Sequence, residues 1–375
     1  MTNILWPLMM VPVLWQIMMM MLLIYILMEL LVLWAVIKYP ETEISNTSPS
    51  TAFSILIPFK DEAENLPFLL QSLKKLNYPE ALFEIILIDD QSADNWAEII
   101  EKHDFVRVIA NKNTGKKQAL LTGVKVARYE WIVTTDADCK VPENWLRYLD
   151  AAIQKRKPKM LLGPVAYTDD GRFITRFQQY EFLSLQALSM AGVFWQHPFL
   201  SNGAHLAFEK KAFFAVNAYE GNIEIASGDD VFLLEKFQKK YPGKIGFIKN
   251  TKALVLTAPQ PDWSSLVQQK IRWAGKSKFY QSNWPKLIGI ITILANIGIW
   301  ISLLTFHCFT CAKMYIIIKL LSDTILVYTM CKIYRTKFSG STWLGVFLLY
   351  PLYVMYIFFR SLSSGYEWKG RKYRL

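Results

Sequence analysis

The sequence predicts a doubly wound α/β domain flanked by membrane-spanning helices. Between residues 52 and 135, short apolar runs typical of buried strands alternate with stretches of helical periodicity. Long apolar runs almost free of charged residues lie at both ends of the chain. At about 20 residues per crossing, each is long enough to span a bilayer. These observations exclude a disordered chain, a disulfide scaffold and an ordinary cytosolic enzyme.

The N-terminal run is expected to be a retained membrane anchor over residues 1–39. It lacks the basic start and the small-residue cleavage site of a signal peptide. Glu29 interrupts this run, and a carboxylate inside the membrane should face another helix or a polar cavity. A polar linker over residues 40–51 then leads to the soluble domain.

Three further apolar stretches are expected within residues 286–360, and a basic tail over residues 361–375 ends the sequence. Most Lys and Arg residues lie in the soluble domain, which favours a cytoplasmic position for it at a plasma (inner) membrane, with the N-terminus outside. Four complete crossings would place both termini outside, whereas the basic tail favours the inside. The sequence leaves the number of crossings and the side of the C-terminus open.

The net charge of +11 indicates an anionic partner. Nucleic acid is not expected, because no basic run interleaved with aromatic residues lies on a recognisable nucleic-acid-binding fold. The apolar runs favour an anionic membrane surface or a phosphorylated substrate instead.

The elements of the soluble domain follow in an α/β order. Strands are expected over residues 53–58, 84–89, 105–110 and 131–135, and helices over residues 61–76, 93–102 and 116–128. This alternation predicts a parallel sheet with right-handed crossovers. Ligands of such sheets bind at the carboxyl ends of the strands. The loops after Pro58, Asp89 and Thr135 are therefore the expected places for site residues.

Two pairs of acids follow expected strands. Asp136 and Asp138 are one residue apart and suit a divalent cation, which would in turn bind a diphosphate. Solvated loop acids are the alternative. Asp89 and Asp90 could accept hydrogen bonds from a nucleobase or ribose. Taken alone, that pair is better explained as a turn or a helix cap.

Basic and acidic residues at expected helix starts form a second group. Lys116 follows a glycine at the expected start of a helix, and a helix N-terminus with a lysine attracts phosphate. The alternative is a solvated basic turn. Asp229 and Asp230 open another helix, where the dipole stabilises acids. One of them could instead be a general base.

The segment Gln269 to Trp273 (QKIRW) lies just before an apolar run. Arg272 offers a rigid fork for phosphate oxygens. Trp273 offers a flat face for a sugar or a lipid headgroup. Taken alone, the segment is better explained as an interfacial belt of aromatic and basic residues just before the membrane.

In this order, the segments resemble the membrane-bound branch of the family 2 glycosyltransferases, which have the GT-A fold and include cellulose synthase, hyaluronan synthase and ceramide glucosyltransferase. The segments that carry the resemblance are IPFKDEAENL, IDDQSAD, GKKQAL, DAD, GDD and QKIRW. The resemblance implies a GT-A catalytic domain over residues 52–261 and an interfacial segment with a Q-x-x-R-W motif over residues 262–285.

The resemblance also implies a role for each candidate residue. It assigns the nucleotide-sugar donor to Glu62, Asp89, Asp90, Lys116, Asp136 and Arg272. It assigns a divalent metal, Mg²⁺ or Mn²⁺, to Asp136 and Asp138. Asp230 would be the general base, and Asp229, Gln269 and Trp273 would lie at the acceptor or close over it.

The sequence departs from the family pattern at three places. Asp61 stands for the usual Asn, Gln91 stands for the Gly of DDGS, and Gly228–Asp229 stand for Thr-Glu before the base. The last change leaves the proposed base, Asp230, in place but alters the residues that precede it.

The implied activity is inverting transfer of a sugar from a UDP-sugar to an acceptor at the membrane. A lipid or lipid-linked acceptor is favoured, because about four mostly apolar spans are few for a secretion channel. The alternative is a processive polysaccharide synthase, in which a homo-oligomer could build the channel. A non-catalytic sugar-nucleotide-binding membrane subunit is a third reading, which the presence of Asp136, Asp138 and Asp230 disfavours.

Overall fold

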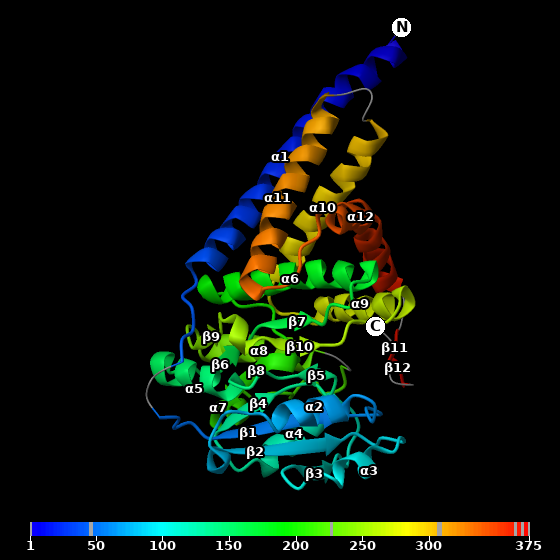
Figure 1. Ribbon diagram of the computed structural model, residues 1–375. Helices are drawn as coiled ribbons and strands as arrows, with labels where there is room; N and C mark the ends of the chain where they lie inside the picture. Colours follow the sequence, from blue (N-terminus) through cyan, green and yellow to red (C-terminus); the bar gives the residue numbers. More distant parts are fainter. Residues whose placement is uncertain are drawn as a thin grey trace.

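The computed structural model describes residues 2–44, 48–225, 228–305, 310–363, 366–368 and 371–373. A domain built on a seven-stranded sheet carries helices that extend away from it on one side (Figure 1). The sheet has the order β3-β2-β1-β4-β8-β6-β9. Its strands are β1 (Phe53–Phe59), β2 (Phe83–Asp89), β3 (Arg107–Ala110), β4 (Trp131–Thr134), β6 (Met160–Leu162), β8 (Leu206–Glu209) and β9 (Ile245–Phe247).

The sheet is mixed, which corrects the expectation of a purely parallel one. Strands β3, β2, β1 and β4 pair in parallel, as the strand–helix alternation predicts. Strand β8 then pairs antiparallel with both β4 and β6. The alternation that the sequence shows ends after β4, so it carries no information about this second half. The α/β fold class is confirmed.

Both faces of the sheet are buried, as a doubly wound fold requires. Along β1, Phe53, Ile55 and Ile57 face one apolar core, while Leu56 faces the other. The helices that accompany the sheet are α2 (Leu66–Leu73), α3 (Trp96–Ile100), α4 (Lys116–Val126), α5 (Trp145–Arg156), α7 (Lys210–Ala215) and α8 (Asp229–Lys240). Helix α2 begins later than the sequence predicts, with Pro67 in its first turn, where the missing N–H costs nothing.

A smaller sheet and two long helices lie between the main sheet and the remaining helices. The smaller sheet has the order β5-β10-β7, with β5 (Cys139–Lys140), β7 (Val165–Tyr167) and β10 (Val255–Thr257). Helices α6 (Phe173–Phe194) and α9 (Trp263–Gly275) run across the top of the domain (Figure 1).

In the part of the chain that the structure describes, four helices are long and apolar enough to cross a membrane, and the protein is a membrane protein. They are α1 (Thr2–Lys38, with the apolar span Val13–Lys38), α10 (Trp284–Leu304), α11 (Thr310–Tyr334) and α12 (Gly340–Ser363). Strands β11 (Tyr366–Trp368) and β12 (Arg371–Tyr373) form a hairpin after α12.

Helix α1 is fastened to the domain at its C-terminal end. The Lys249 ammonium donates to the carbonyls of Val36 (2.8 Å) and Tyr39 (2.9 Å), where it offsets the negative end of the helix dipole. The Tyr39 hydroxyl accepts hydrogen bonds from Arg156 (2.6 Å) and from the Phe247 backbone (2.8 Å). The anchor and the domain are therefore joined by specific contacts.

Glu29 faces a neighbouring helix, as the sequence predicts. Its carboxylate accepts hydrogen bonds from Tyr25 (2.9 Å) on its own helix and from Ser322 on α11. Asp323 lies 3.0 Å from the same Tyr25 hydroxyl, whose single proton the two carboxylates share, and pairs with Lys319 (2.6 Å). The polar groups of α1 and α11 thus satisfy one another inside the helix bundle, where lipid offers no partner.

Candidate active site

A cavity of about 630 Å³ lies between the carboxyl ends of the parallel strands and helix α9. Every candidate residue except Asp89 lines it. These residues are Glu62, Asp90, Lys116, Asp136, Asp138, Asp229, Asp230, Gln269, Arg272 and Trp273. Residues from six separate segments of the sequence therefore meet at one place.

The loops after β1 and β2 form one wall of this cavity. The buried Asp90 carboxylate accepts hydrogen bonds from the Gly115 backbone (2.8 Å) and from the Asn111 amide (2.7 Å), which ties it to the start of α4. Asp89 instead accepts a hydrogen bond from the Ser92 backbone (2.9 Å). Asp89 thus stabilises a turn, which is the alternative to nucleotide binding that the sequence analysis gave for it.

Two departures from the family pattern lie in this wall. Gln91 has φ 64° and Asp61 has φ 50°, so both adopt the left-handed conformation that favours glycine or asparagine. The Asp61 carboxylate accepts a hydrogen bond from the Ala93 backbone (2.7 Å). The Asp61 backbone in turn donates to the Ser92 hydroxyl (3.0 Å), so the two loops hold each other.

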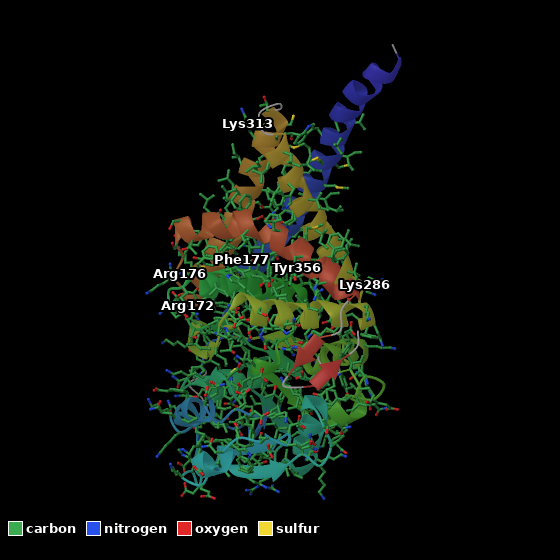
Figure 2. All side chains as sticks on the ribbon, turned by 90° about the vertical axis from the view of Figure 1, so that its right-hand side faces the viewer. Arg172, Arg176, Phe177, Lys286, Lys313 and Tyr356 are labelled. Atoms are coloured by element: carbon green, nitrogen blue, oxygen red, sulfur yellow. The ribbon has the colours of Figure 1, made fainter. Side chains whose placement is uncertain are left out.

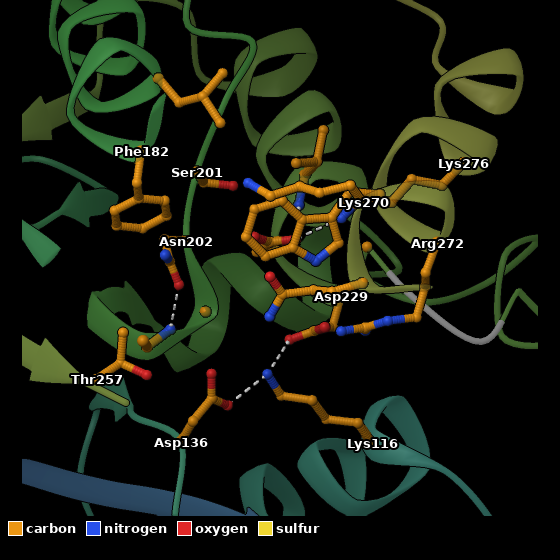
Figure 3. Close-up of a pocket in the computed structure, with 18 of the residues that line it drawn as sticks. Lys116, Asp136, Phe182, Ser201, Asn202, Asp229, Thr257, Lys270, Arg272 and Lys276 are labelled. Carbon is orange, nitrogen blue, oxygen red and sulfur yellow. Dashed lines mark hydrogen bonds and ion pairs between the residues drawn. The ribbon is translucent and has the colours of Figure 1, made fainter. Parts of the chain in front are cut away.

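Lys116 lines the cavity and contacts both groups of acids, Asp136 after β4 and Asp229 at the start of α8 (Figure 3). Its ammonium is 2.7 Å from Asp136 and 3.2 Å from Asp229. Burial alone would lower the pKa of Lys116, but these two carboxylates outweigh it and raise the pKa well above the usual range. Lys116 is therefore a permanent positive charge in the cavity.

Asp136 and Asp138 follow β4 and lie close to Cys139. The ligand atoms of the three side chains lie within 4.8 Å of one another. Burial, and then the neighbouring Asp136 and Glu62, raise the pKa of Asp138 to about 6. Burial also raises the pKa of the Cys139 thiol well above its usual range, so this sulfur stays protonated. Hard cations such as Mg²⁺ and Mn²⁺ prefer oxygen ligands, so the two carboxylates fit them and the thiol does not.

Asp229 and Asp230 open helix α8, and their surroundings separate their pKa values. Burial would raise the pKa of Asp229, but Lys116 and Lys276 outweigh it and hold this pKa below the usual range. Burial raises the pKa of Asp230, although Lys276 opposes the shift from 3.9 Å. Gly228 precedes them with φ 81°, a conformation that the usual Thr-Glu sequence would not adopt easily. Asp230 is thus the acid of the pair whose pKa moves toward neutrality.

Helix α9 covers the cavity with the Q-x-x-R-W side chains. The Lys270 ammonium pairs with Glu181 of α6 (2.7 Å) and lies 4.4 Å from the centre of the Trp273 ring, which fixes this ring in place. Arg272 and Gln269 line the cavity. Within the described part of the chain, the buried Gln269 carbonyl oxygen has no hydrogen-bond partner and remains able to accept one.

Several residues that line the cavity were not identified from the sequence, among them Lys276, Gly203 and Ser201. Lys276 lies one helical turn after Arg272, a spacing that would have indicated it. Gly203 has no such indication, yet a β-carbon there would lie 3.0 Å from the Lys116 ammonium and 3.1 Å from the Asp229 carboxylate. Ser201 also lines the cavity, and its buried hydroxyl has no partner among the described residues.

The fold and the acids at its strand ends define a GT-A-like domain. Residues 54–214 match the model of glycosyl transferase family 2, and this segment is a domain of that family. The solved mannosyltransferase from Pyrobaculum calidifontis, in complex with GDP-mannose and Mn²⁺, is 15% identical. It covers 92% of this chain and 96% of its own at a TM-score of 0.55, which supports the shared fold.

Two curated relatives come from bacterial cell-envelope chemistry. The poly-β-1,6-N-acetyl-D-glucosamine synthase of Staphylococcus epidermidis is 28% identical over 250 residues, which cover 62% of this chain and 57% of the relative. The undecaprenyl-phosphate 4-deoxy-4-formamido-L-arabinose transferase of Proteus mirabilis is 32% identical over 109 residues, which cover 27% of this chain and 33% of the relative. The chain therefore spans a little over half of the first relative and about a third of the second.

Proposed function

We propose that this protein is a glycosyltransferase that moves a sugar from a nucleotide sugar, most simply a UDP-sugar, to a lipid or lipid-linked acceptor at the membrane. One observation carries the proposal. The strand-end acids, the acid pair of α8 and the cations of α4 and α9 line a single cavity beneath the membrane helices. Glycosyl transfer needs these groups together, because a diphosphate must leave while an acceptor hydroxyl loses its proton.

The nucleotide lies on the wall that carries Glu62 and Asp90, in this proposal. Asp89 does not touch the nucleotide. Its carboxylate accepts a hydrogen bond from the Ser92 backbone and so stabilises the turn that positions Asp90. Lys116 and Arg272 stand where a diphosphate would find positive charge, and the fixed charge of Arg272 suits the oxygens of a leaving phosphate. Lys276 adds a third cation on the same side as Arg272.

Asp136 and Asp138 would hold the divalent metal. Their two carboxylates supply the oxygen ligands that Mg²⁺ or Mn²⁺ prefers, at the end of a strand that faces the diphosphate. When bound, such an ion offsets the charge that develops on the leaving diphosphate. The Lys116 ammonium lies 2.7 Å from the Asp136 carboxylate and offsets part of its negative charge.

Asp230 is the proposed general base. Its raised pKa brings the carboxylate closer to the basicity that a neutral-pH base needs, and its position at the cavity wall faces the acceptor side. Asp230 takes the proton of the acceptor hydroxyl as this oxygen attacks the anomeric carbon from the face opposite the diphosphate. Asp229, held ionised by Lys116 and Lys276, positions these cations and carries no proton. Gln269 and Trp273 would line the acceptor side.

The helix bundle supports a lipid acceptor over a secreted polymer. Trp15, Leu22, Ala295, Ile299 and Tyr315 fill the space between α1, α10 and α11. At Gly298 an added β-carbon would lie 2.1 Å from the Tyr315 hydroxyl, so two of the helices touch there. A polysaccharide chain needs a polar tunnel, and these side chains occupy its place. The similarity to a poly-N-acetylglucosamine synthase keeps polymer synthesis as the second candidate, with a channel built by several copies.

The proposal places the catalytic domain in the cytoplasm at the inner, or plasma, membrane. Nucleotide sugars are made there, and most basic residues of the chain lie on the domain.

The test is transfer of label from a panel of radiolabelled UDP-sugars and GDP-mannose in membranes that contain the protein, with Mg²⁺ or Mn²⁺. Organic-soluble label that is lost in Asp230→Asn and kept in Asp104→Asn, an exposed acid outside the cavity, supports the proposal. Label in large water-soluble or insoluble material establishes the polymer synthase instead. If membranes with the wild type, membranes with Asp230→Asn and membranes without the protein all give the same amount of label, the protein does not catalyse transfer. That result would favour a non-catalytic sugar-nucleotide-binding subunit.

A further inference from the structure

Helix α12 does not run with the other membrane helices. Helices α1, α10 and α11 extend side by side away from the sheet, whereas α12 lies crosswise over α6 and α9 (Figures 1 and 2). In both views it stays near the domain ends of the other three helices. Its length and composition alone would allow a crossing. Its placement has to be decided from its contacts.

Both halves of α12 contact α6. The Ser339 backbone, just before α12, donates to the Tyr180 hydroxyl of α6 (2.9 Å). Fourteen residues further on, Tyr353 packs edge-on against Phe177 of the same helix, with ring centres 4.8 Å apart. A helix that crossed the bilayer would carry Tyr353 about 20 Å from Ser339 along the membrane normal, at 1.5 Å per residue. The helix therefore starts and continues at the level of α6.

The end of α12 also stays beside the domain. Ile357 lines the catalytic cavity, together with Pro285 at the start of α10 and with α9 residues. The hairpin that follows contacts α9 through β11. Figure 1 places β11 and β12 close to α9. Nothing in the described part of α12 reaches the far end of the bundle, where α10 ends and α11 begins.

The outer face of α12 is apolar along its length. Leu344, Leu348, Leu352 and Tyr356 recur every fourth residue, and each is 47–52% exposed. The opposite face packs on the protein through Trp343, Val346, Phe347, Tyr353 and Ile357, all less than 9% exposed. A helix that is apolar on both faces is unstable against water, so the outer row requires lipid.

The distribution of basic residues independently favours three crossings. If α12 stays on the domain side, the segments that lie in the membrane or on its far side are residues 1–37 and 287–318. Their sequence contains one Lys or Arg residue, Lys313. The loop before α12 then lies on the domain side with Arg335 and Lys337, as does the tail with Lys369, Arg371, Lys372 and Arg374. Four crossings would move the four basic tail residues to the far side, against the tendency of basic segments to remain inside.

We propose that α12 lies in the plane of the membrane, with its outer row in the acyl region of the leaflet on the catalytic side, so that the chain crosses the bilayer three times and its termini lie on opposite sides. The partner of this surface is the lipid of that leaflet. Because Ile357 belongs to both α12 and the cavity, the cavity borders the lipid surface directly. The inference concerns placement and holds whatever sugar or acceptor the protein uses.

Thiol labelling in sealed vesicles of both orientations tests the crossing number. In a background with Cys308 and Cys311 replaced by serine, Lys372→Cys should react with a membrane-impermeant maleimide from the same side as Lys337→Cys. Lys313→Cys marks the opposite side. Reaction of Lys372→Cys from the side of Lys313→Cys would show a fourth crossing and overturn the proposal.

Depth measurement tests the orientation of α12 without relying on the tail. A nitroxide is placed in turn at residues 344, 348, 352 and 356, and its relaxation by oxygen and by a water-soluble nickel chelate is compared in vesicles. A helix in the membrane plane gives four similar depths. A crossing helix gives depths that change by about 6 Å from each site to the next, over about 18 Å in total, and this result refutes the inference. Neither readout uses transferase activity, so failure here and failure of the proposed function are separate results.

Discussion

Removal of the Lys276 ammonium should shift the acidic limb of the pH profile of kcat/KM to higher pH. Asp230 acts as a base only when it is ionised, and burial already raises its pKa. Lys276, 3.9 Å away, is the largest influence that opposes this rise. Lys276→Gln therefore raises the pKa of Asp230 further. The base is then protonated over a wider acidic range, so the acidic limb of the kcat/KM profile moves to higher pH.

The size of the effect follows from the charge separation. Two unit charges about 4 Å apart attract each other by about 4 kcal/mol at an effective dielectric constant of about 20. Lys116 also acts on Asp230 and retains part of this stabilisation. If about a third of the attraction is lost, about 1.4 kcal/mol, kcat/KM on the acidic limb falls about tenfold.

The assay is initial-rate transfer from the labelled donor as a function of pH, for the wild type, Lys276→Gln and Lys278→Gln. Lys278 lies in the same short helical segment but is exposed and does not line the cavity, so its variant controls for the loss of a positive charge. Thermal unfolding of each variant checks that the fold is intact. An unchanged acidic limb in a folded Lys276→Gln protein would refute the pairing of Lys276 with the base.

Three further results are expected. Asp230→Asn should lower kcat by about 10²–10⁴-fold while UDP binding by calorimetry stays within about twofold of the wild type, because a general base acts in the transition state; full activity would exclude Asp230 as the base. Chelation of divalent cations should abolish transfer, and added Mn²⁺ should restore it in the wild type but not in Asp136→Ala; undiminished activity in the chelator would contradict the metal site. Gly298→Ala should destabilise the protein in detergent by about 1–3 kcal/mol through overpacking, because its β-carbon would lie 2.1 Å from the Tyr315 hydroxyl. Gly289→Ala in the same helix meets nothing within 4 Å and should be neutral or slightly stabilising in the same melting experiment.

The parallel half of the sheet was predictable because its information is local. Each buried strand is a short apolar run that a helix separates from the next, and the observed bounds of β1 and β2 differ from the expected ones by one residue at most. Strand β8 escaped prediction because its pairing joins β4 to a segment more than 70 residues later. Such a pairing depends on which edge of the sheet is still free to form hydrogen bonds, and a local sequence pattern does not indicate this edge.

The candidate site shows the same division. Motif order indicated Asp136, Asp230 and Arg272, and the structure places all three around one cavity. Their roles remain proposals. Gly203 was not indicated, because its importance arises only when Lys116 and Asp229 approach it from other segments. The different pKa directions of Asp229 and Asp230 likewise depend on lysines from α4 and from the segment after α9.

The amino-acid order by itself determined the α/β class, the membrane attachment and the set of chemical groups, because strand and helix periodicity, apolar length and residue type are properties of neighbouring residues. Tertiary packing alone decided the antiparallel centre of the sheet, which cations face which acids, and the crosswise position of α12. That helix is long and apolar enough to cross a bilayer. Its contacts with Phe177 and Tyr180 of α6 hold it at the domain surface instead, and such contacts exist only after distant segments have folded together.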